Sequence, residues 1–302
     1  MITELSSAKL SQLNRWHSLA YFLFHKFRFL GSRKLYRIIS KFFLPRLSSK
    51  IFSPTIYGFD LVVEPDNAYD YYYLGFYEVG ALNIFKSVLK EGDIFVDVGA
   101  NIGLMSFYSS KIVGKKGSVI SFEPTNKYYD YLTAAIRKNN FQNITPIKKA
   151  LGKEKGSFPI YFNNVCPSLV KTNETDKFEI IEVEVLDDIL EFNNITKVKL
   201  IKIDVEGFEL EVVKGARKLF SSDDAPIACV EFVRGQQTIT DNGQTALDLL
   251  KQLNSYRFFQ LEKSSDTISK LVEVSDFKNL HDNDNVFCLL EHHVSKYNNL
   301  IK

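Results

Sequence analysis

The chain has 302 residues, of which 45% are hydrophobic and 25% charged. This composition is that of a globular protein and excludes disorder along the whole chain, and the length suits one α/β domain with an added segment. The net charge of +2 is unevenly spread: residues 1–50 hold ten Lys or Arg and one acid, and the remaining residues hold 28 basic and 35 acidic groups. Because the body of the chain is mildly acidic, we expect no nucleic-acid partner.

The three cysteines, Cys166, Cys229 and Cys288, are odd in number and lack CxxC spacing. This pattern disfavours a disulfide framework and a cysteine zinc site, and it indicates free thiols in a reducing compartment. The apolar run Ser18–Phe24 ends at His25 and is shorter than the about 18–20 residues that span a bilayer. We expect a cytoplasmic protein, with peripheral contact to a membrane as the alternative.

Residues 1–55 are predicted to form a basic, amphipathic, helical N-terminal segment. Hydrophobic residues recur at helical spacing from Leu19 to Leu30 and again from Leu35 to Phe43, with basic residues beside them. Two roles are open for residues 10–52. They pack on the body or on a second subunit of a homo-oligomer, or they dock on an anionic surface such as a membrane or a charged glycan.

Residues 56–302 are predicted to form one domain. It begins with an alternating segment over 56–64 and a tyrosine run from Tyr69 to Tyr77, which suits either sugar stacking or a packed cover. A helix over Gly80–Lys90 follows. Strands and helices then alternate along the chain, which predicts a mostly parallel, doubly wound, Rossmann-like α/β sheet with ligands at the carboxyl ends of its strands.

The predicted strands and helices are defined by buried-type runs between turn residues. The strands, in chain order, are Ile94–Val98, Ser118–Phe122, Ile144–Ala150, an inserted pair at 157–162 and 179–185, Val198–Val205, Ile227–Phe232, Arg257–Leu261 and Val286–Leu290. The helices are Gly103–Val113, Asn126–Asn139 with Asn126 as its cap, a short turn at Leu186–Glu191, Glu206–Phe220 and Thr245–Asn254.

The first of these strands ends in Asp97-Val-Gly-Ala-Asn-Ile-Gly103. Gly99 and Gly103 let the backbone come close to a ligand, and the following helix offers free N–H groups to a carboxylate or a phosphate. A dinucleotide would need GxGxxG and would meet like-charge repulsion at Asp97. S-adenosylmethionine fits better, because its ammonium and sulfonium groups suit an acid at this position.

The next two strands supply the rest of the expected donor site. Glu123 follows Gly103 by twenty residues and ends a strand, where a carboxylate can accept both hydroxyls of a ribose. The loop at Ala150 is expected to flank the adenine.

Charged residues interrupt the strand Leu200-Ile-Lys-Ile-Asp204, which is otherwise apolar. Asp204 and Glu206 are predicted to line the reaction centre, with Glu206 at a helix start, and Glu231 at the end of the next strand is a third candidate acid. Asp204 is also predicted to bind the cofactor, because it lies where the transferred methyl group should be. A plain ion pair between Lys202 and a carboxylate is the alternative explanation. Asp187 and Asp188 either cap a turn or reach the site.

These motifs together resemble the FkbM-type methyltransferases. The resemblance covers residues 77–232 and is carried by Tyr77-Glu78, DIFVDVGANIG at 93–103, Phe122-Glu123-Pro124, Ala150-Leu151-Gly152, Leu186-Asp187-Asp188 and IKIDVEGFELEVVKGA at 201–216. It implies a class I methyltransferase that uses S-adenosylmethionine and methylates hydroxyls of sugars, glycans or natural products. It also implies a donor site of Glu78, Asp97, Gly99, Asn101, Gly103 and Glu123, and a reaction centre at Asp204, Glu206 and Gly207.

We therefore expect an O-methyltransferase whose acceptor is a hydroxyl of a sugar or glycan. An O-methyltransferase of a non-sugar small molecule, a non-catalytic nucleotide-binding protein and a NAD-dependent oxidoreductase are the alternatives. The five histidines lie outside the matched region, so a carboxylate from Asp204, Glu206 or Glu231 is the expected base, or these groups hold a divalent cation. His281, just before the last strand, is a further candidate base.

Overall fold

The computed structural model describes residues 2, 50–64, 77–162, 167–168, 177–233 and 244–302. The two helices expected before Pro45 lie outside the described residues, as do Cys166 and the tyrosines of the run other than Tyr77. In the part of the chain that is described, no helix has both the length and the hydrophobicity needed to cross a membrane.

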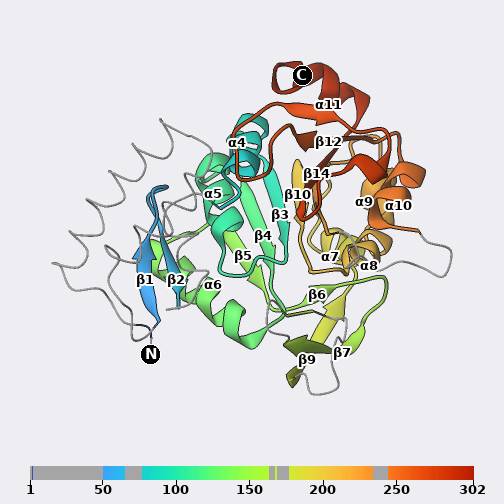
Figure 1. The fold of residues 1–302 in the computed structure, drawn as a ribbon. Helices are drawn as coiled ribbons and strands as arrows, with labels where there is room; N and C mark the ends of the chain where they lie inside the picture. The colour runs from blue at the N-terminus through green and yellow to red at the C-terminus, as the bar shows by residue number, and fades with distance from the viewer. Residues whose placement is uncertain (1, 3–49, 65–76, 163–166, 169–176, 234–243) are drawn as a thin grey trace.

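An eight-stranded sheet forms the centre of the fold, in the order β13-β12-β14-β11-β10-β3-β4-β5 (Figure 1). Its strands are β3 (Ile94–Val98), β4 (Ser118–Phe122), β5 (Ile144–Ile147), β10 (Leu200–Ile203), β11 (Ile227–Phe232), β12 (Arg257–Leu261), β13 (Leu271–Glu273) and β14 (Asp284–Leu289). The five strands from β5 to β11 are parallel, whereas β14 runs antiparallel between β11 and β12. This order confirms the doubly wound fold, and it reverses direction between β3 and β10, where such sheets bind ligands.

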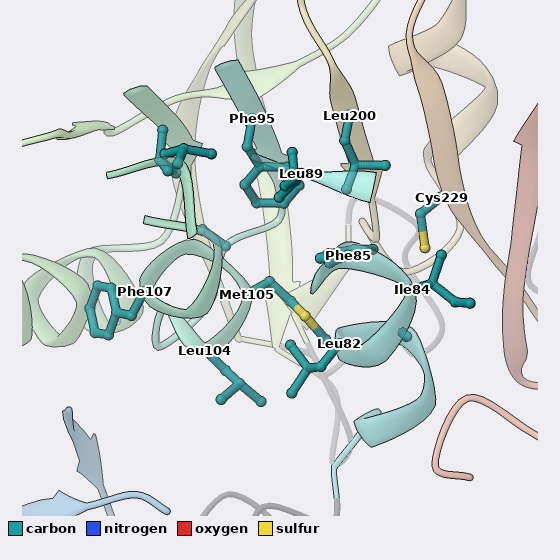
Figure 2. Close-up of a cluster of buried hydrophobic side chains, with 14 of the residues drawn as sticks. Leu82, Ile84, Phe85, Leu89, Phe95, Leu104, Met105, Phe107, Leu200 and Cys229 are labelled. Carbon is teal, nitrogen blue, oxygen red and sulfur yellow. The ribbon is translucent and has the colours of Figure 1, made fainter. Parts of the chain in front are cut away.

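Helices cover both faces of this sheet. One face packs against α4 (Val79–Val88), α5 (Leu104–Val113) and α6 (Asn126–Asn139), and the other against α7 (Leu186–Phe192), α8 (Glu209–Lys214), α9 (Arg217–Ser221) and α10 (Ala246–Leu253). Figure 2 shows the first layer, in which Phe85 and Ile84 of α4 meet Phe95, Leu200 and Cys229 of the sheet. The short 3-10 helix η2 (Phe277–Asn279) precedes β14, and the helices α11 (Glu291–Lys296) and η3 (Asn298–Leu300) follow it.

Two smaller sheets flank the centre. β1 (Ile51–Pro54) and β2 (Asp60–Val63) form an antiparallel hairpin, and the domain boundary expected after residue 55 falls in its loop. We propose that the boundary lies before β1. The inserted strand pair is present as β7 (Gly156–Phe162) and β9 (Lys177–Glu184), which pair antiparallel in a four-stranded sheet with β6 (Ala150–Leu151) and β8 (Pro167–Ser168).

Three local predictions were wrong. The expected strand over 144–150 ends at Ile147, because Ala150 pairs instead with Val183 of β9 in the four-stranded sheet. The expected helix over 206–220 begins only at Glu209, because Glu206 and Gly207 adopt positive φ, and it is split into α8 and α9. The cap of α6 is Thr125 rather than Asn126, since the Thr125 hydroxyl accepts from the N–H of Tyr128.

Candidate active site

A cleft opens at the carboxyl ends of β3, β4 and β10, at the point where the strand order reverses. Its empty space is about 1080 Å³, including the part open to solvent. The predicted residues that line it are Asp97, Gly99, Asn101, Glu123, Ala150, Asp204 and Glu206. Three other predicted residues, Glu78, Gly103 and Glu231, lie next to the cleft without lining it.

The loop between β3 and α5 is tightly constrained. Gly99 has a φ of +85°, and a Cβ there would lie 1.8 Å from the carbonyl oxygen of Asp204. Gly103 is the N-cap of α5 with a φ of +96°, and a Cβ there would collide with Leu132 and Phe107. The N-cap residue Gly103 has no side chain that could cap α5, and Ser106 in the first turn makes a backbone hydrogen bond to Asp97. A ligand carboxylate at this helix start would accept from the N–H groups that precede Ser106.

Glu123 is buried at the end of β4, and its carboxylate is held by two backbone N–H groups and one hydroxyl. Its Oε2 accepts from the N–H of Asn101 at 2.9 Å, and its Oε1 accepts from the N–H and the hydroxyl of Thr125 at 3.0 and 2.6 Å. Burial raises the pKa of Glu123, and the hydrogen bonds from Thr125 and Asn101 oppose that rise. Oε2, with one acceptor position used, is the oxygen with room for a ligand hydroxyl.

Asp97 lies at the base of the cleft and is almost fully buried. Its Oδ2 accepts from the hydroxyl of Ser106 at 2.5 Å, and the Ser106 and Ser121 hydroxyls are hydrogen-bonded to each other at 2.7 Å. Burial raises the pKa of Asp97 to about 6, against the lowering effects of Ser106 and Lys202. A buried acid of this kind is stabilised in its charged form by a bound cation.

Lys202 provides a buried positive charge at the same depth, and it pairs in register with Asp97 of β3. Its ammonium contacts the carboxylate of Asp204 and lies 3.7 Å from Oε2 of Glu78. Burial lowers the pKa of Lys202, but Asp204 and Glu78 overcome this effect and raise it well above its usual value. The ion pair considered as the alternative explanation is therefore present, and it sits inside the cleft.

Asp204 of this ion pair meets two further carboxylates. Oxygen atoms of Asp204, Glu206 and Glu231 all lie within 4.8 Å of one another. Burial and then the charges of Asp204 and Glu206 raise the pKa of Glu231 far above its usual value, and Glu231 hydrogen-bonds to Asp204. Of the three, Glu231 is the one whose charged form the surroundings disfavour. An acidic cluster alone does not make a metal site, and we assign none.

The turn that carries Glu206 depends on a residue that our sequence analysis did not single out. Glu206 has a φ of 54°, a strained conformation for a residue with a side chain. The buried Oε1 of Glu209 accepts from the N–H groups of Val205 and Gly207 at 3.2 and 3.0 Å and so holds this turn. Burial raises the pKa of Glu209 to about 7. The signal was available, since Glu209 lies in the motif at 201–216.

Two further candidates lie away from the cleft. The carboxylate of Asp187 accepts from the N–H groups of Lys218 and Leu219 at 2.7 and 3.0 Å, so it caps α9. His281 does not line the cleft, and its Nδ1 lies 3.9 Å from Asp284.

Comparison with known proteins gives the family. The model of the FkbM methyltransferase domain matches residues 97–258, more than half of the chain. Hexuronic acid methyltransferase AglP of Haloferax volcanii is 29% identical over 148 residues, which is 48% of this chain and 59% of that protein. Methyltransferase sdnD of Sordaria araneosa is 28% identical over 160 residues, covering 42% of this chain and 61% of that protein. The chain thus spans about three fifths of the length of these relatives.

Solved structures give a weaker likeness. A putative rRNA-methylase from Clostridium thermocellum superposes with a TM-score of 0.42 and 15% identity, over 69% of this chain and 90% of that chain. The fold rests on the strand order itself rather than on this likeness. The matched domain begins at Asp97, contains the cleft residues of β3, β4 and β10, and covers more than half of the sequence, so the chain belongs to the FkbM methyltransferase family.

Proposed function

We propose that the cleft binds S-adenosylmethionine and that the chain transfers its methyl group to a hydroxyl of a sugar or glycan. One observation carries the proposal: Asp97, Glu123 and Asp204 stand at the carboxyl ends of three parallel strands and line a single cleft. Membership of a methyltransferase family supports the same reading.

The residues present fit this donor. The N–H groups of α5 that precede Ser106 suit its carboxylate, and buried Asp97 suits its cationic amino group. Oε2 of Glu123 has room for a ribose hydroxyl, although Thr125 already occupies Oε1. We therefore propose that Glu123 binds the ribose mainly through Oε2 rather than equally through both oxygens. Ala150 lines the cleft beside this position, where the adenine is expected.

The donor supplies a methyl group on a leaving group that departs as a neutral thioether. An alcohol needs to lose its proton as its oxygen attacks, so the chain has to provide an acceptor for that proton. Asp204 is the ion-pair partner of Lys202, whereas burial and the neighbouring charges raise the pKa of Glu231. We propose that a new bond forms between the acceptor oxygen and the methyl carbon, that the carbon–sulfur bond breaks, and that the hydroxyl proton passes to Asp204 or Glu206.

The sugar acceptor is supported by a relative and by the cleft wall. AglP is named as a hexuronic acid methyltransferase and is 29% identical over the matched part. Tyr77 lines the cleft, and tyrosine combines an apolar face with a hydroxyl, as sugar recognition requires. A non-sugar hydroxyl remains the second candidate, because sdnD is named only as a methyltransferase.

Calorimetric titration with S-adenosylhomocysteine tests the donor site. Wild-type protein should bind it and should not bind NAD⁺, and the variants Asp97→Asn and Glu123→Gln should each weaken binding by about tenfold or more. Folded protein that binds neither compound would overturn the proposal. A screen of sugars, hexuronic acids and non-sugar alcohols with labelled S-adenosylmethionine would then separate the two acceptor classes.

Residues 10–52, for which we predicted these partners, lie almost wholly outside the described residues. An anionic surface and a second subunit remain our proposals for them. Co-sedimentation with phosphatidylserine vesicles, and light scattering for the oligomeric state, would test each separately.

A further inference from the structure

A buried polar network reaches the cleft from the C-terminal part of the chain. Nδ2 of Asn285 on β14 donates to Oε1 of Glu78 at 3.0 Å, and the two residues are 207 positions apart. Asn285 is 2% exposed and Glu78 8% exposed. The other oxygen of Glu78 faces the Lys202 ammonium at 3.7 Å, and Lys202 contacts Asp204. Two members of this network, Glu78 and Asn285, lie outside the family match at 97–258.

The loop between β12 and β13 fixes the position of Glu78. The N–H of Glu78 donates to Asp266 at 2.7 Å, and the N–H of Gly80 donates to the carbonyl of Ser265 at 2.6 Å. Gly80 lies so close to this loop that a Cβ there would be 2.5 Å from the carbonyl oxygen of Thr267. Glu78 itself has a φ of 47°, which costs free energy for a residue with a side chain. The fold therefore holds Glu78 in a strained position against Lys202.

Both the nitrogen and the oxygen of the Asn285 side-chain amide make hydrogen bonds. Its Nδ2 also lies 3.1 Å from the hydroxyl oxygen of Ser265, and its Oδ1 accepts from Sγ of Cys229 at 3.5 Å. The amide cannot turn over without breaking these contacts, so a donor always faces Glu78. Neither Glu78 nor Asn285 lines the cleft, whereas Lys202, which faces Glu78, and Asp204, which contacts Lys202, both line it.

The charges around the base of the cleft do not balance. Asp97, Asp204 and Glu78 share one ammonium, that of Lys202, and Asp266 adds a further negative charge to the surroundings of Glu78. When these acids are ionised, the cleft base carries net negative charge. In a medium of low dielectric constant, such a charge favours a cation over a neutral ligand of the same shape.

We propose that Asn285 is a positioning residue that holds Glu78 against Lys202, and that Glu78 thereby makes the cleft select the cationic methyl donor over its neutral product. This inference rests on the proposed donor. The family resemblance implied that Glu78 contacts the donor directly. We propose instead that the negative charge of Glu78 acts on the donor without such a contact. Such selectivity would favour exchange of spent product for fresh donor after each transfer.

The test compares two ligands that differ in charge. Sinefungin carries an amine in place of the methylated sulfur, and S-adenosylhomocysteine is neutral there. Both are titrated by calorimetry at about pH 8, above the pKa of Glu78, which burial raises to about 7. The variants are Glu78→Gln, which keeps the shape, and Asn285→Ala, with Asn285→Ser as a less disruptive second choice. Asn143→Ala is the matched control, because Asn143 is a partly buried amide bonded to Ser110 and Gly114, away from the cleft lining.

The measured quantity is the preference for sinefungin, taken as the ratio of the two dissociation constants. It should fall by about tenfold in Glu78→Gln and by about threefold in the Asn285 variants, and it should not change in Asn143→Ala. If the role of Glu78 is merely structural, Glu78→Gln weakens the binding of both ligands equally and leaves the ratio unchanged. That result would overturn this inference but not the proposed donor. Wild-type protein that binds neither ligand would instead overturn the proposed donor, and this inference with it.

Discussion

The loop after β3 and the loop after β10 touch through Gly99 and Asp204, with no space for a side chain between them. A Cβ on Gly99 would lie 1.8 Å from the carbonyl oxygen of Asp204, and the N–H of Asp204 donates to the carbonyl of Val98 at 3.0 Å. The loop proposed to bind the donor and the loop proposed to hold the base are therefore one rigid unit. Their relative position is set by backbone contact rather than by adaptable side chains.

This contact makes Gly99→Ala a severe change. The substitution combines a positive φ with a steric collision, so we expect it to lower the free energy of unfolding by about 3 kcal/mol or more and to abolish S-adenosylhomocysteine binding. Gly92→Ala is the matched control, because Gly92 has a φ of +91° but no atom within 4 Å of the added Cβ. The control should lose only about 1–2 kcal/mol and keep its affinity. Chemical denaturation measures both, and equal losses would show that the contact is unimportant.

We expect the conformation and surroundings of Glu206 to lower the stability of the folded protein. Its φ of 54° and its place beside Asp204 and Glu231 both cost free energy. Glu206→Gly should therefore raise the free energy of unfolding by about 1 kcal/mol while methyl transfer falls. Glu206→Gln keeps the strain and removes only the charge, so it separates the two effects. A lower melting temperature in Glu206→Gly than in wild type would contradict this account.

The central sheet could be predicted closely because its signals are local. Buried runs bounded by turn residues define β3, β4, β11 and β12, and the predicted bounds agree with the structure. Parallel strands place their carboxyl ends at one edge, so Asp97, Glu123 and Asp204 could be expected in one cleft before any coordinates were known.

The remaining features depend on contacts that no local pattern encodes. Ala150 leaves the central sheet because β9 offers it a pairing partner more than 25 residues later. The turn at Glu206 replaces a helix start because Glu209 folds back on the N–H groups of Val205 and Gly207. The link between Glu78 and Asn285 joins residues 207 positions apart, so spacing could not reveal it.

Glu209 predicts a specific dependence of stability on pH. Burial raises its pKa in the folded protein to about 7 from an ordinary 4.5, so the folded state holds this proton more tightly than the unfolded state. The resulting stabilisation is complete below about pH 4.5 and is lost as the pH rises through about 7. Glu209→Gln imitates the protonated form and still accepts from both N–H groups. It should match wild type at about pH 5 and exceed it at about pH 8 by up to about 3 kcal/mol.

Glu184→Gln is a control for that experiment, because the stability contribution of Glu184 depends on pH in the opposite direction. The pKa of Glu184 is lowered by its hydrogen bond with Lys149, so its contribution is present above its ordinary pKa and is lost at acid pH. This variant should lose stability relative to wild type at about pH 8 and not gain it. Urea denaturation at both pH values measures the difference in stability between each variant and wild type. If Glu209→Gln is no more stable than wild type at the higher pH, burial does not raise the pKa of Glu209 as argued.

Asp204→Asn tests the proposed base. The substitution keeps the shape of the side chain and removes the carboxylate that would take the hydroxyl proton, so we expect methyl transfer to the acceptor found by screening to fall by about 10²–10⁴-fold. Affinity for S-adenosylhomocysteine should change little, because the ribose and carboxylate contacts are made by the loops after β3 and β4. Lys202 keeps one carboxylate, Glu78, at 3.7 Å, so the variant should fold with reduced stability.

Asp187→Asn is the matched control for the loss of one carboxylate. Asp187 also belongs to a family motif, but its carboxylate caps α9 and does not line the cleft. Per folded molecule, this control should transfer methyl groups at the wild-type rate, and its defect should appear only in thermal unfolding. If Asp204→Asn retains full turnover, the proton must go elsewhere, and Glu206, the other acceptor proposed in the same cluster, would then be replaced next.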